Sequence, residues 1–233
     1  MRTKRHVSFA ASVALFISTT AFTATFAEDF SGMTTGTCYP DGSVTGAWKF
    51  IYNGYGCNGF VSVSDNTMLF ERPKVATLPD ETHANLVVGP SIGGDVVLQL
   101  RTVTTRQLRE GSAPNPWEVG WVIWNYTDSD HCYYFIAKPN GWELGKRDPA
   151  YPGGQRFLAT GSAPSYPIGA WYRIEIIQSG NTMKVLVDDL PVTTFTDRER
   201  PYSSGHIGMY TEDAETYFED ISMITGPGKG KKK

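Results

Sequence analysis

The stretch WYRIEIIQSGNTMKVLVDD, residues 171–189, decides the fold class of this chain. It contains two runs in which apolar and polar side chains alternate, the pattern of a β-strand with one buried face. Ser179, Gly180 and Asn181 stand between the two runs and favour a tight turn. The stretch is therefore predicted to form a β-hairpin.

Similar runs, rich in β-branched and aromatic residues, follow one another along most of the chain. Fourteen segments are predicted as strands: 48–53, 60–63, 67–70, 83–88, 96–104, 118–125, 132–138, 141–147, 155–160, 171–179, 182–187, 190–196, 205–211 and 215–223. The 24 glycines and 14 prolines mark turns between them, and we find no helical periodicity over ten residues. The pattern predicts an all-β domain, a two-sheet antiparallel sandwich in which Asp29-Phe30 pairs with residues 218–221.

The two ends of the chain differ in composition from the middle. Residues 1–27 combine a basic start, a short apolar run and a small residue at Ala27, which predicts a secretory signal peptide cleaved before Glu28. A membrane anchor is the alternative, although the apolar run is short and contains Ser and Thr. Residues 28–225 are expected to form one domain and residues 226–233 a flexible basic tail. The expected location is secreted or periplasmic, without stable membrane insertion.

The net charge of −3 conceals an acidic domain. Seven of the 21 basic residues lie in the two terminal segments, which leaves 24 acidic and 14 basic residues between them. A nucleic-acid-binding surface needs clustered basic residues, so this balance argues against a nucleic-acid partner.

The chain has three cysteines. Cys38 and Cys57 enclose a glycine-rich segment, and export would allow them to form a disulfide. Cys132 lies in a predicted strand and is expected to be a buried thiol. A catalytic pairing with His131 is disfavoured, because adjacent strand residues point to opposite faces.

Three segments carry a resemblance to a known superfamily: EDFSG (28–32), the hairpin with the following LPVTTFTD (171–197), and SGHIGMYTEDAETYFEDISM (204–223). They resemble concanavalin A-like lectin/glucanase sandwiches of the jelly-roll type. More narrowly, they resemble laminin-G-like domains and the 3-keto-disaccharide hydrolase domain family. The resemblance implies the fold and a glycan ligand, but such folds serve both binding and catalysis. The E-x-D-x-x-E signature of laminarinase-like hydrolases and the motif set of jelly-roll alginate lyases are absent.

Residues 117–156 contain the densest group of aromatic and charged side chains. Aromatic rings can cover the apolar faces of sugars, while charged groups bind their hydroxyls. Alternation places Trp124 and Tyr126 on one strand face and Trp121 on the other. The ligand-binding candidates are Arg101, Trp124, Trp142, Lys146, Arg147 and Arg156. For each tryptophan a place in the core is the alternative, and for the bases a salt-bridged surface. If the glycan were a uronate polymer, these bases would neutralise its carboxylates.

Four residues are candidates for catalysis: His83, His131, Tyr133 and Glu143. Each histidine lies near carboxylates in the sequence and could act as a general base, while a structural or exposed histidine is the alternative. A lyase would combine such a base with Tyr133 and an arginine. A glycosidase would need two carboxylates, such as Glu143 with a second acid.

The superfamily resemblance also implies a structural Ca²⁺ that joins the first and last strands. Asp29 and Asp220 are the corresponding candidate ligands, and ordinary solvated acids are the alternative.

The sequence leaves two main functions possible. The first is a secreted carbohydrate-binding sandwich that recognises a polysaccharide or cell-wall glycan. The second is a polysaccharide-degrading enzyme, a glycoside hydrolase or polysaccharide lyase, on the same scaffold. A surface adhesion protein is a third, weaker possibility. In each case the expected partner is a polysaccharide or oligosaccharide.

Overall fold

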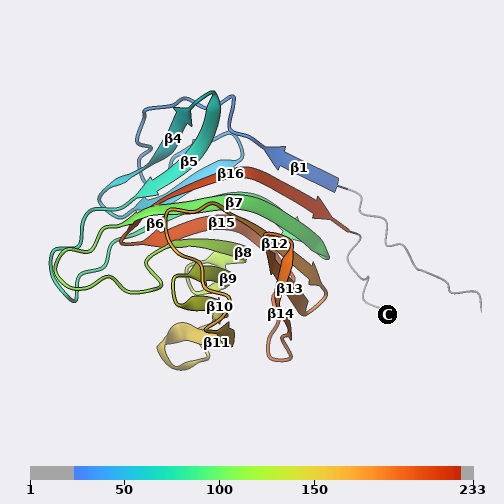
Figure 1. Cartoon of the computed structure of the whole chain (residues 1–233). Helices are drawn as coiled ribbons and strands as arrows, with labels where there is room; N and C mark the ends of the chain where they lie inside the picture. The colour runs from blue at the N-terminus through green and yellow to red at the C-terminus, as the bar shows by residue number, and fades with distance from the viewer. Residues whose placement is uncertain (1–23, 227–233) are drawn as a thin grey trace, which may run out of the picture.

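The computed structural model describes residues 24–226, which form two stacked antiparallel β-sheets (Figure 1). Each sheet has eight strands, and the sandwich does not close into a barrel. The only helical element in the described range is a short 3₁₀ turn, η1 (Pro152–Gly154). The predicted all-β sandwich is confirmed.

Sheet A has the order β14-β13-β12-β7-β16-β5-β4, and β1 pairs with β16. Its strands are β1 (Ala24–Glu28), β4 (Cys57–Val63), β5 (Asn66–Arg72), β7 (Val96–Gln107), β12 (Tyr172–Ser179), β13 (Thr182–Val187), β14 (Leu190–Thr196) and β16 (Ala214–Thr225). The stretch that decided the fold class forms the β12–β13 hairpin, in which Ser179 pairs with Thr182. Gly180 provides the positive φ of 58° that its tight turn requires.

Sheet B has the order β11-β10-β9-β8-β15-β6-β3-β2. Its strands are β2 (Val44–Thr45), β3 (Trp48–Asn53), β6 (Ala84–Gly93), β8 (Gly120–Asp128), β9 (His131–Lys138), β10 (Gly141–Arg147), β11 (Gln155–Gly161) and β15 (Ser204–Glu212). The four strands β8 to β11 form one continuous antiparallel meander. This meander holds most of residues 117–156, the aromatic segment of the sequence.

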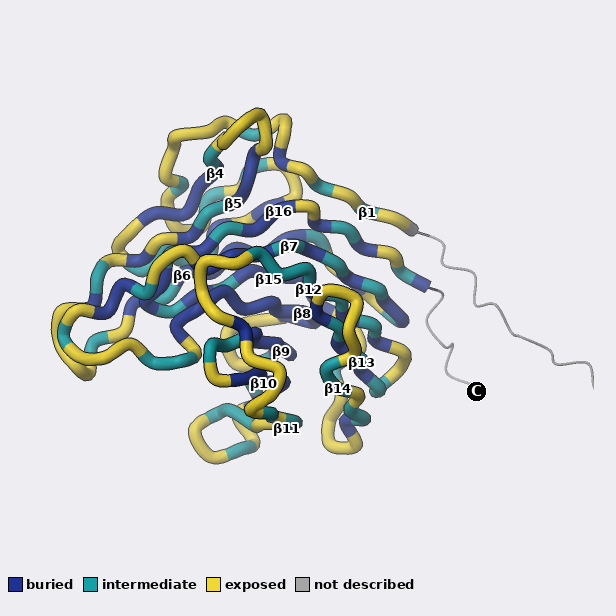
Figure 2. Tube along the Cα trace, viewed as in Figure 1, coloured by how far each residue is buried: buried dark blue, intermediate teal, exposed yellow. Residues whose placement is uncertain are grey.

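The core lies between the two sheets and is dominated by aromatic and branched side chains. Trp48, Trp124, Tyr133, Phe135 and Phe218 are each fully buried in it. Buried residues run through the middle strands of both sheets, whereas exposed residues gather in the connecting loops (Figure 2). Burying this apolar surface is the main contribution that stabilises the sandwich.

All fourteen predicted strands are present, with ends shifted by a few residues. The two ends of the chain do pair, but not at the predicted residues: Ala24–Glu28 of β1 lie opposite residues 221–225 of β16, and Asp29 and Phe30 follow the end of β1. The predicted disulfide between Cys38 and Cys57 is present. Cys132 is a buried free cysteine, as expected. No helix in residues 24–226 is long and apolar enough to span a membrane.

The predicted leader and tail fall largely outside the described residues. The exception at the N-terminal side is residues 24–27, which form β1 together with Glu28. Cleavage before Glu28 stays a prediction, and it would remove all but one residue of β1.

Candidate functional site

The outer face of sheet B, which turns away from sheet A, carries a second apolar cluster that is separate from the core. On β8 the core residues Val122 and Trp124 alternate with the outward residues Trp121 and Ile123. The cluster comprises Leu86, Val88, Val119, Trp121, Ile123, Tyr126, Cys132, Tyr134 and Ile136, with Ile51, Tyr52 and Tyr210 packed against it. Clustered apolar side chains on an outward face are typical of a binding surface.

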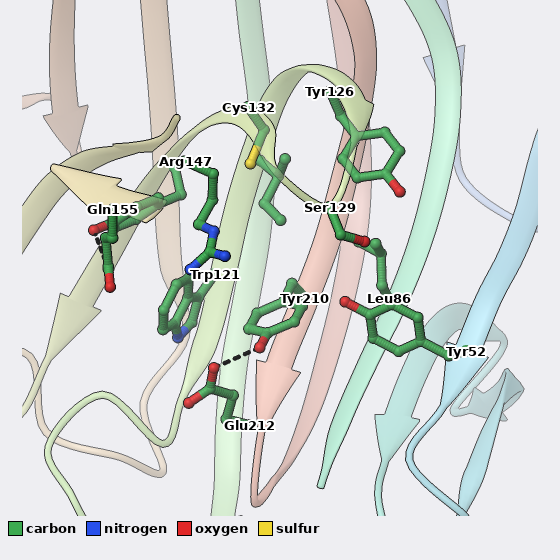
Figure 3. A pocket seen from close by; sticks show the side chains of 12 residues that line it. Tyr52, Leu86, Trp121, Tyr126, Ser129, Cys132, Arg147, Gln155, Tyr210 and Glu212 are labelled. Atoms are coloured by element: carbon green, nitrogen blue, oxygen red, sulfur yellow. Dashed lines mark hydrogen bonds between the residues drawn. The ribbon is translucent and has the colours of Figure 1, made fainter. Parts of the chain in front are cut away.

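A pocket of about 230 Å³ opens over this cluster (Figure 3). Its lining comes from seven successive strands of sheet B, from β3 at one side to β11 at the other. The lining residues are Tyr52, Leu86, Trp121, Ile123, Tyr126, Ser129, Cys132, Tyr134, Arg147, Gln155, Tyr210 and Glu212. Drug-sized ligands occupy pockets of roughly 300–1,000 Å³, so this pocket suits a smaller group such as a sugar ring.

Trp121 is the central aromatic residue of the pocket. Its ring centroid lies 5.0 Å from that of Tyr134 and 5.0 Å from that of Tyr210. The indole Nε1 donates a hydrogen bond of 2.8 Å to the carbonyl of Trp117, which holds the ring in place. A fixed aromatic surface of this kind can stack on the apolar face of a sugar.

A bulge in β8 brings Tyr126 into the pocket. Strict alternation predicts that Tyr126 shares a face with the core residue Trp124, and this prediction is wrong. Asn125 has a φ of 51°, in the left-handed region that Asn tolerates better than most residues, and the β8–β9 register shifts beyond Trp124. The extra residue turns Tyr126 to the outer face of sheet B, the face that also carries Trp121.

Tyr134 forms one wall of the pocket and depends on a glycine. Gly145 lies opposite it on β10, and a Cβ at Gly145 would come within 2.2 Å of the Tyr134 ring. The hydroxyl of Tyr134 donates to Glu143 at 2.9 Å and accepts from Gln155 at 2.5 Å. Lys138 also donates to Glu143, at 3.0 Å. The ring is therefore fixed both by packing and by hydrogen bonds.

Arg147 and Glu212 are the two charged residues of the pocket lining. Arg147 contacts Asp130 at 3.4 Å and keeps about a third of its side chain exposed. Glu212 accepts a hydrogen bond from the hydroxyl of Tyr210 (Figure 3). Burial, together with the negative charges of Asp213 and Glu118, raises the pKa of the Glu212 carboxyl above its ordinary value. A cation and a carboxylate with a raised pKa thus face the same small space.

Cys132 also lines the pocket but has no nucleophilic character. Burial raises the pKa of its thiol to about 12. Since the thiolate is the reactive form, a thiol with this pKa is inert near neutral pH.

Four of the predicted site residues lie inside the sandwich. Trp124 donates from its indole to Gln178 at 2.8 Å, and Trp142 to the carbonyl of Ala163 at 3.0 Å. The ammonium group of Lys146, which is fully buried, donates to Asp197 at 2.9 Å. Tyr133 donates to the same carboxylate at 2.7 Å. None of the four lines the pocket.

The Lys146–Asp197 pair is a structural ion pair between β10 and the segment after β14. Lys146 also donates to the carbonyls of Glu199 and Arg200, at 2.6 and 3.1 Å. Burial tends to raise the pKa of Asp197, but the hydrogen bonds from Lys146, from the Glu199 amide and from Tyr133 hold it below its usual value. Arg156 joins the edge of this group through Glu199, at 3.2 Å.

The remaining predicted residues lie apart from one another. His131 is the partly exposed first residue of β9 and contacts Asp128 at 2.7 Å. Arg101 lies on the outer face of sheet A, where it contacts Glu219 and covers Trp171. Buried His83 contacts Glu81 at 3.1 Å in the loop before β6. Of the residues predicted for catalysis or ligand binding, only Arg147 lines the pocket, while Glu143 supports it through Tyr134.

Asp29 and Asp220 do lie together, at a shallow depression along the β1–β16 seam. Asp29 accepts a hydrogen bond from the amide of Ser31, and Asp220 lies 3.7 Å from Arg101. Within residues 24–226 no three His, Cys, Asp or Glu side chains are grouped as a metal site would require. Calcium at this seam stays a prediction.

Sequence reasoning missed most of the pocket lining, above all Tyr52, Tyr134, Tyr210 and Glu212. Alternation separates each strand into two faces but does not say which face is outward. The available signal was that both faces of β8 and β9 are apolar, which is unusual for a sheet with one solvated face.

Comparison with solved structures shows the same fold in proteins of very low sequence identity. A carbohydrate-binding module (CBM66) from Bacillus subtilis is 13% identical, with a TM-score of 0.56, covering 77% of this chain and 96% of the module. A protein of unknown function with a galectin-like fold, also from Bacillus subtilis, is 11% identical, with a TM-score of 0.52 and coverage of 78% and 90%. Domain 4 of an extracellular arabinanase from Geobacillus stearothermophilus is 8% identical, with a TM-score of 0.50 and coverage of 86% and 91%. These similarities establish the fold.

No curated protein matches the sequence significantly. The model of one protein family does match, over residues 40–224, which include every residue of the pocket lining. The match spans most of the chain and nearly the whole sandwich from β2 to β16. This chain therefore belongs to the family of 3-keto-alpha-glucoside-1,2-lyase-like domains.

Proposed function

We propose that this protein binds a saccharide in the pocket on the outer face of sheet B. The observation that carries the proposal is the pocket itself, in which seven strands place aromatic rings around one arginine and one carboxylate. Sugars present apolar C–H faces to aromatic rings and hydroxyl groups to charged and amide side chains. The family name and the carbohydrate-binding neighbour support a saccharide as the ligand.

We further propose that the protein acts after export. The Cys38–Cys57 disulfide supports this, because disulfides persist in oxidising compartments and are rare in the cytosol. The basic and apolar composition of residues 1–27 is the independent sequence argument.

Trp121→Ala tests the binding proposal. Removing the central ring should weaken binding of a cognate glycan, found with a glycan panel, by at least about tenfold, equivalent to about 1.4 kcal/mol. Isothermal titration calorimetry measures the affinity, and near-ultraviolet circular dichroism checks the fold. The matched control is Trp171→Ala, which removes a tryptophan beside Arg101 on the outer face of sheet A. Equal affinities of wild type and Trp121→Ala would contradict the proposed site.

A second candidate function is elimination from a 3-keto glucoside, and the presence of Glu212 and Arg147 in the lining of one pocket favours it. A ketone at C3 acidifies the hydrogen on C2. A base removes that proton, the electron pair left on C2 forms a C1–C2 double bond as the C1–O bond breaks, and the leaving oxygen takes the proton back from the base and departs as the alcohol. Glu212, whose pKa is raised above its ordinary value, would act as the base, and Arg147 would stabilise the developing enolate oxygen.

An assay with a 3-keto glucoside separates the two functions. Ultraviolet absorbance from an unsaturated product, with release of the alcohol, would support the lyase. Binding of the same compound at several pH values without any product would contradict the lyase function and support binding alone.

A further inference from the structure

A buried ion-pair network adjoins Glu212 through Asp213, its neighbour in the chain, and is built by the loops before β6 and β8. Its centre is Arg109, whose side chain is 3% exposed. Nε donates to Glu118 at 2.6 Å and Nη2 to Asp213 at 2.6 Å. The remaining donors reach the carbonyls of Leu78, Pro79 and Glu81 and the hydroxyl of Thr82. One guanidinium thus connects two loops to Asp213.

Asp213 is the single residue that carries the chain from sheet B to sheet A. Strand β15 ends at Glu212 and strand β16 begins at Ala214. Asp213 has a φ of 43°, in the left-handed region, and is fully buried. Besides the bond from Arg109, the Asp213 carbonyl accepts from the Leu108 amide at 2.6 Å, and the Asp213 amide donates to the His83 carbonyl at 2.9 Å. The Asp213 carboxylate accepts from the His83 amide at 2.8 Å. The position of Asp213 is therefore fixed from three sides, and Glu212 is its neighbour in the chain.

The network also sets the charge around Glu212. Its two carboxylates, Glu118 and Asp213, are both fully buried and share one guanidinium, so the charge behind Glu212 is net negative. Two further charged and titratable groups lie near Glu212, namely Tyr210 on the same strand and Arg147 on β10, and Tyr52 on β3 lies near Tyr210. His83 contacts the network from the loop before β6, with its Nδ1 3.9 Å from Asp213.

We propose that the Arg109 network is a positioning element for Glu212, in which Arg109 and Glu118 fix Asp213 and thereby set the place and the charge environment of Glu212. The proposal rests on the proposed function only in assuming that Glu212 contacts the saccharide. Arg109 and His83 would then act on the site through their hydrogen bonds to Asp213, although neither residue lines the pocket.

Glu118→Gln tests this inference. The amide keeps an oxygen that can accept from Arg109 and from Asn115, but it removes one of the two buried negative charges. Carbon-13 NMR of the labelled carboxyl groups follows the titration of Glu212 without any ligand. In Glu118→Gln we expect the midpoint of the Glu212 titration to shift to lower pH. The pH at which saccharide affinity changes should shift to lower pH with it. A purely structural role of Glu118 would not move either midpoint.

Glu175→Gln is the matched control, because it removes the same charge on the outer face of sheet A, where Glu175 bonds Gln99. It should leave the Glu212 midpoint unchanged. If Glu118→Gln does not fold, Asn115→Asp adds a negative charge beside Glu118 instead and should raise the midpoint. A Glu212 midpoint that neither variant moves would overturn the inference. If the wild type binds no saccharide, the proposed function fails, and the titration alone still decides this inference.

Discussion

Glu212 is the carboxylate of the pocket, and both proposed functions depend on it. One oxygen accepts the Tyr210 hydroxyl, which leaves the other for a ligand. Its environment has opposing effects, since burial and the nearby Asp213 and Glu118 raise its pKa while Tyr210 and Arg147 lower it. The net result is a raised pKa, so the carboxyl keeps its proton to a higher pH than an ordinary glutamic acid.

This raised pKa predicts how saccharide affinity depends on pH. The ionised form accepts stronger hydrogen bonds from sugar hydroxyls than the protonated form. Affinity should therefore fall as pH decreases through the raised pKa of Glu212, at a pH above the ordinary value of 4.5. Calorimetry between pH 4 and pH 8 measures the profile. Glu212→Gln should bind more weakly at pH 8 and lose this pH dependence, and a variant that keeps the wild-type profile would contradict the assignment.

At the scale of strands, the pocket is built by departures from regular alternation. β9 and β10 place Tyr134 over Gly145, and the bulge at Asn125 turns Tyr126 outward. Most strands could be predicted from the sequence, because short alternating runs and turn residues are local signals. The pocket could not, because the bulge at Asn125 is a single-residue change of conformation and Asn occurs in many ordinary turns. β2 was missed because it has two residues, and β1 because its residues fall in the predicted leader.

Gly145→Ala tests the β9–β10 wall of the pocket. The added Cβ would lie 2.2 Å from the Tyr134 ring, so the ring has to move away from β10. We expect saccharide affinity to fall by at least about tenfold, because the Tyr134 ring that packs against Trp121 is displaced. Overpacking also costs stability, typically about 1–3 kcal/mol. Tyr134→Ala is the control: the double variant with Gly145→Ala should bind no worse than Tyr134→Ala alone, and additive losses would contradict this explanation.

The β1–β16 seam is the second element that can be tested. If Ca²⁺ joins Asp29 and Asp220, excess calcium should raise the melting temperature, because binding to the folded state stabilises it. The stabilisation would be about 2.7 kcal/mol at a hundred times the dissociation constant. Differential scanning calorimetry with calcium or with a chelator measures the effect. Asp220→Asn should abolish it, and identical melting temperatures of the wild type with calcium and with chelator would exclude the site.

At the scale of the whole molecule, the described interior contains a buried acid that has neither a counter-charge nor a hydrogen-bond partner. Glu71 on β5 is fully buried, and neither of its carboxyl oxygens has a hydrogen-bond partner among the described residues. Burial raises its pKa well above the ordinary value of 4.5. Asn58 and Thr216 lie opposite it on the neighbouring strands, so the acid is enclosed by sheet A on both sides. The folded state therefore favours the neutral carboxyl.

Glu71 makes the stability of the sandwich depend on pH, with a sign that follows from proton linkage. Between pH 4.5 and the raised pKa, the folded state holds a proton on Glu71 that the unfolded state has released, so stability decreases as pH rises. The contribution to the slope is up to about 1.4 kcal/mol per pH unit. In Glu71→Gln this contribution is absent at every pH. Urea unfolding of both proteins from pH 5 to pH 7.5 should show a difference in stability that grows with pH in favour of the variant. Curves that run parallel over this range, separated by a constant offset, would show that Glu71 is ionised in the folded protein and would contradict the raised pKa.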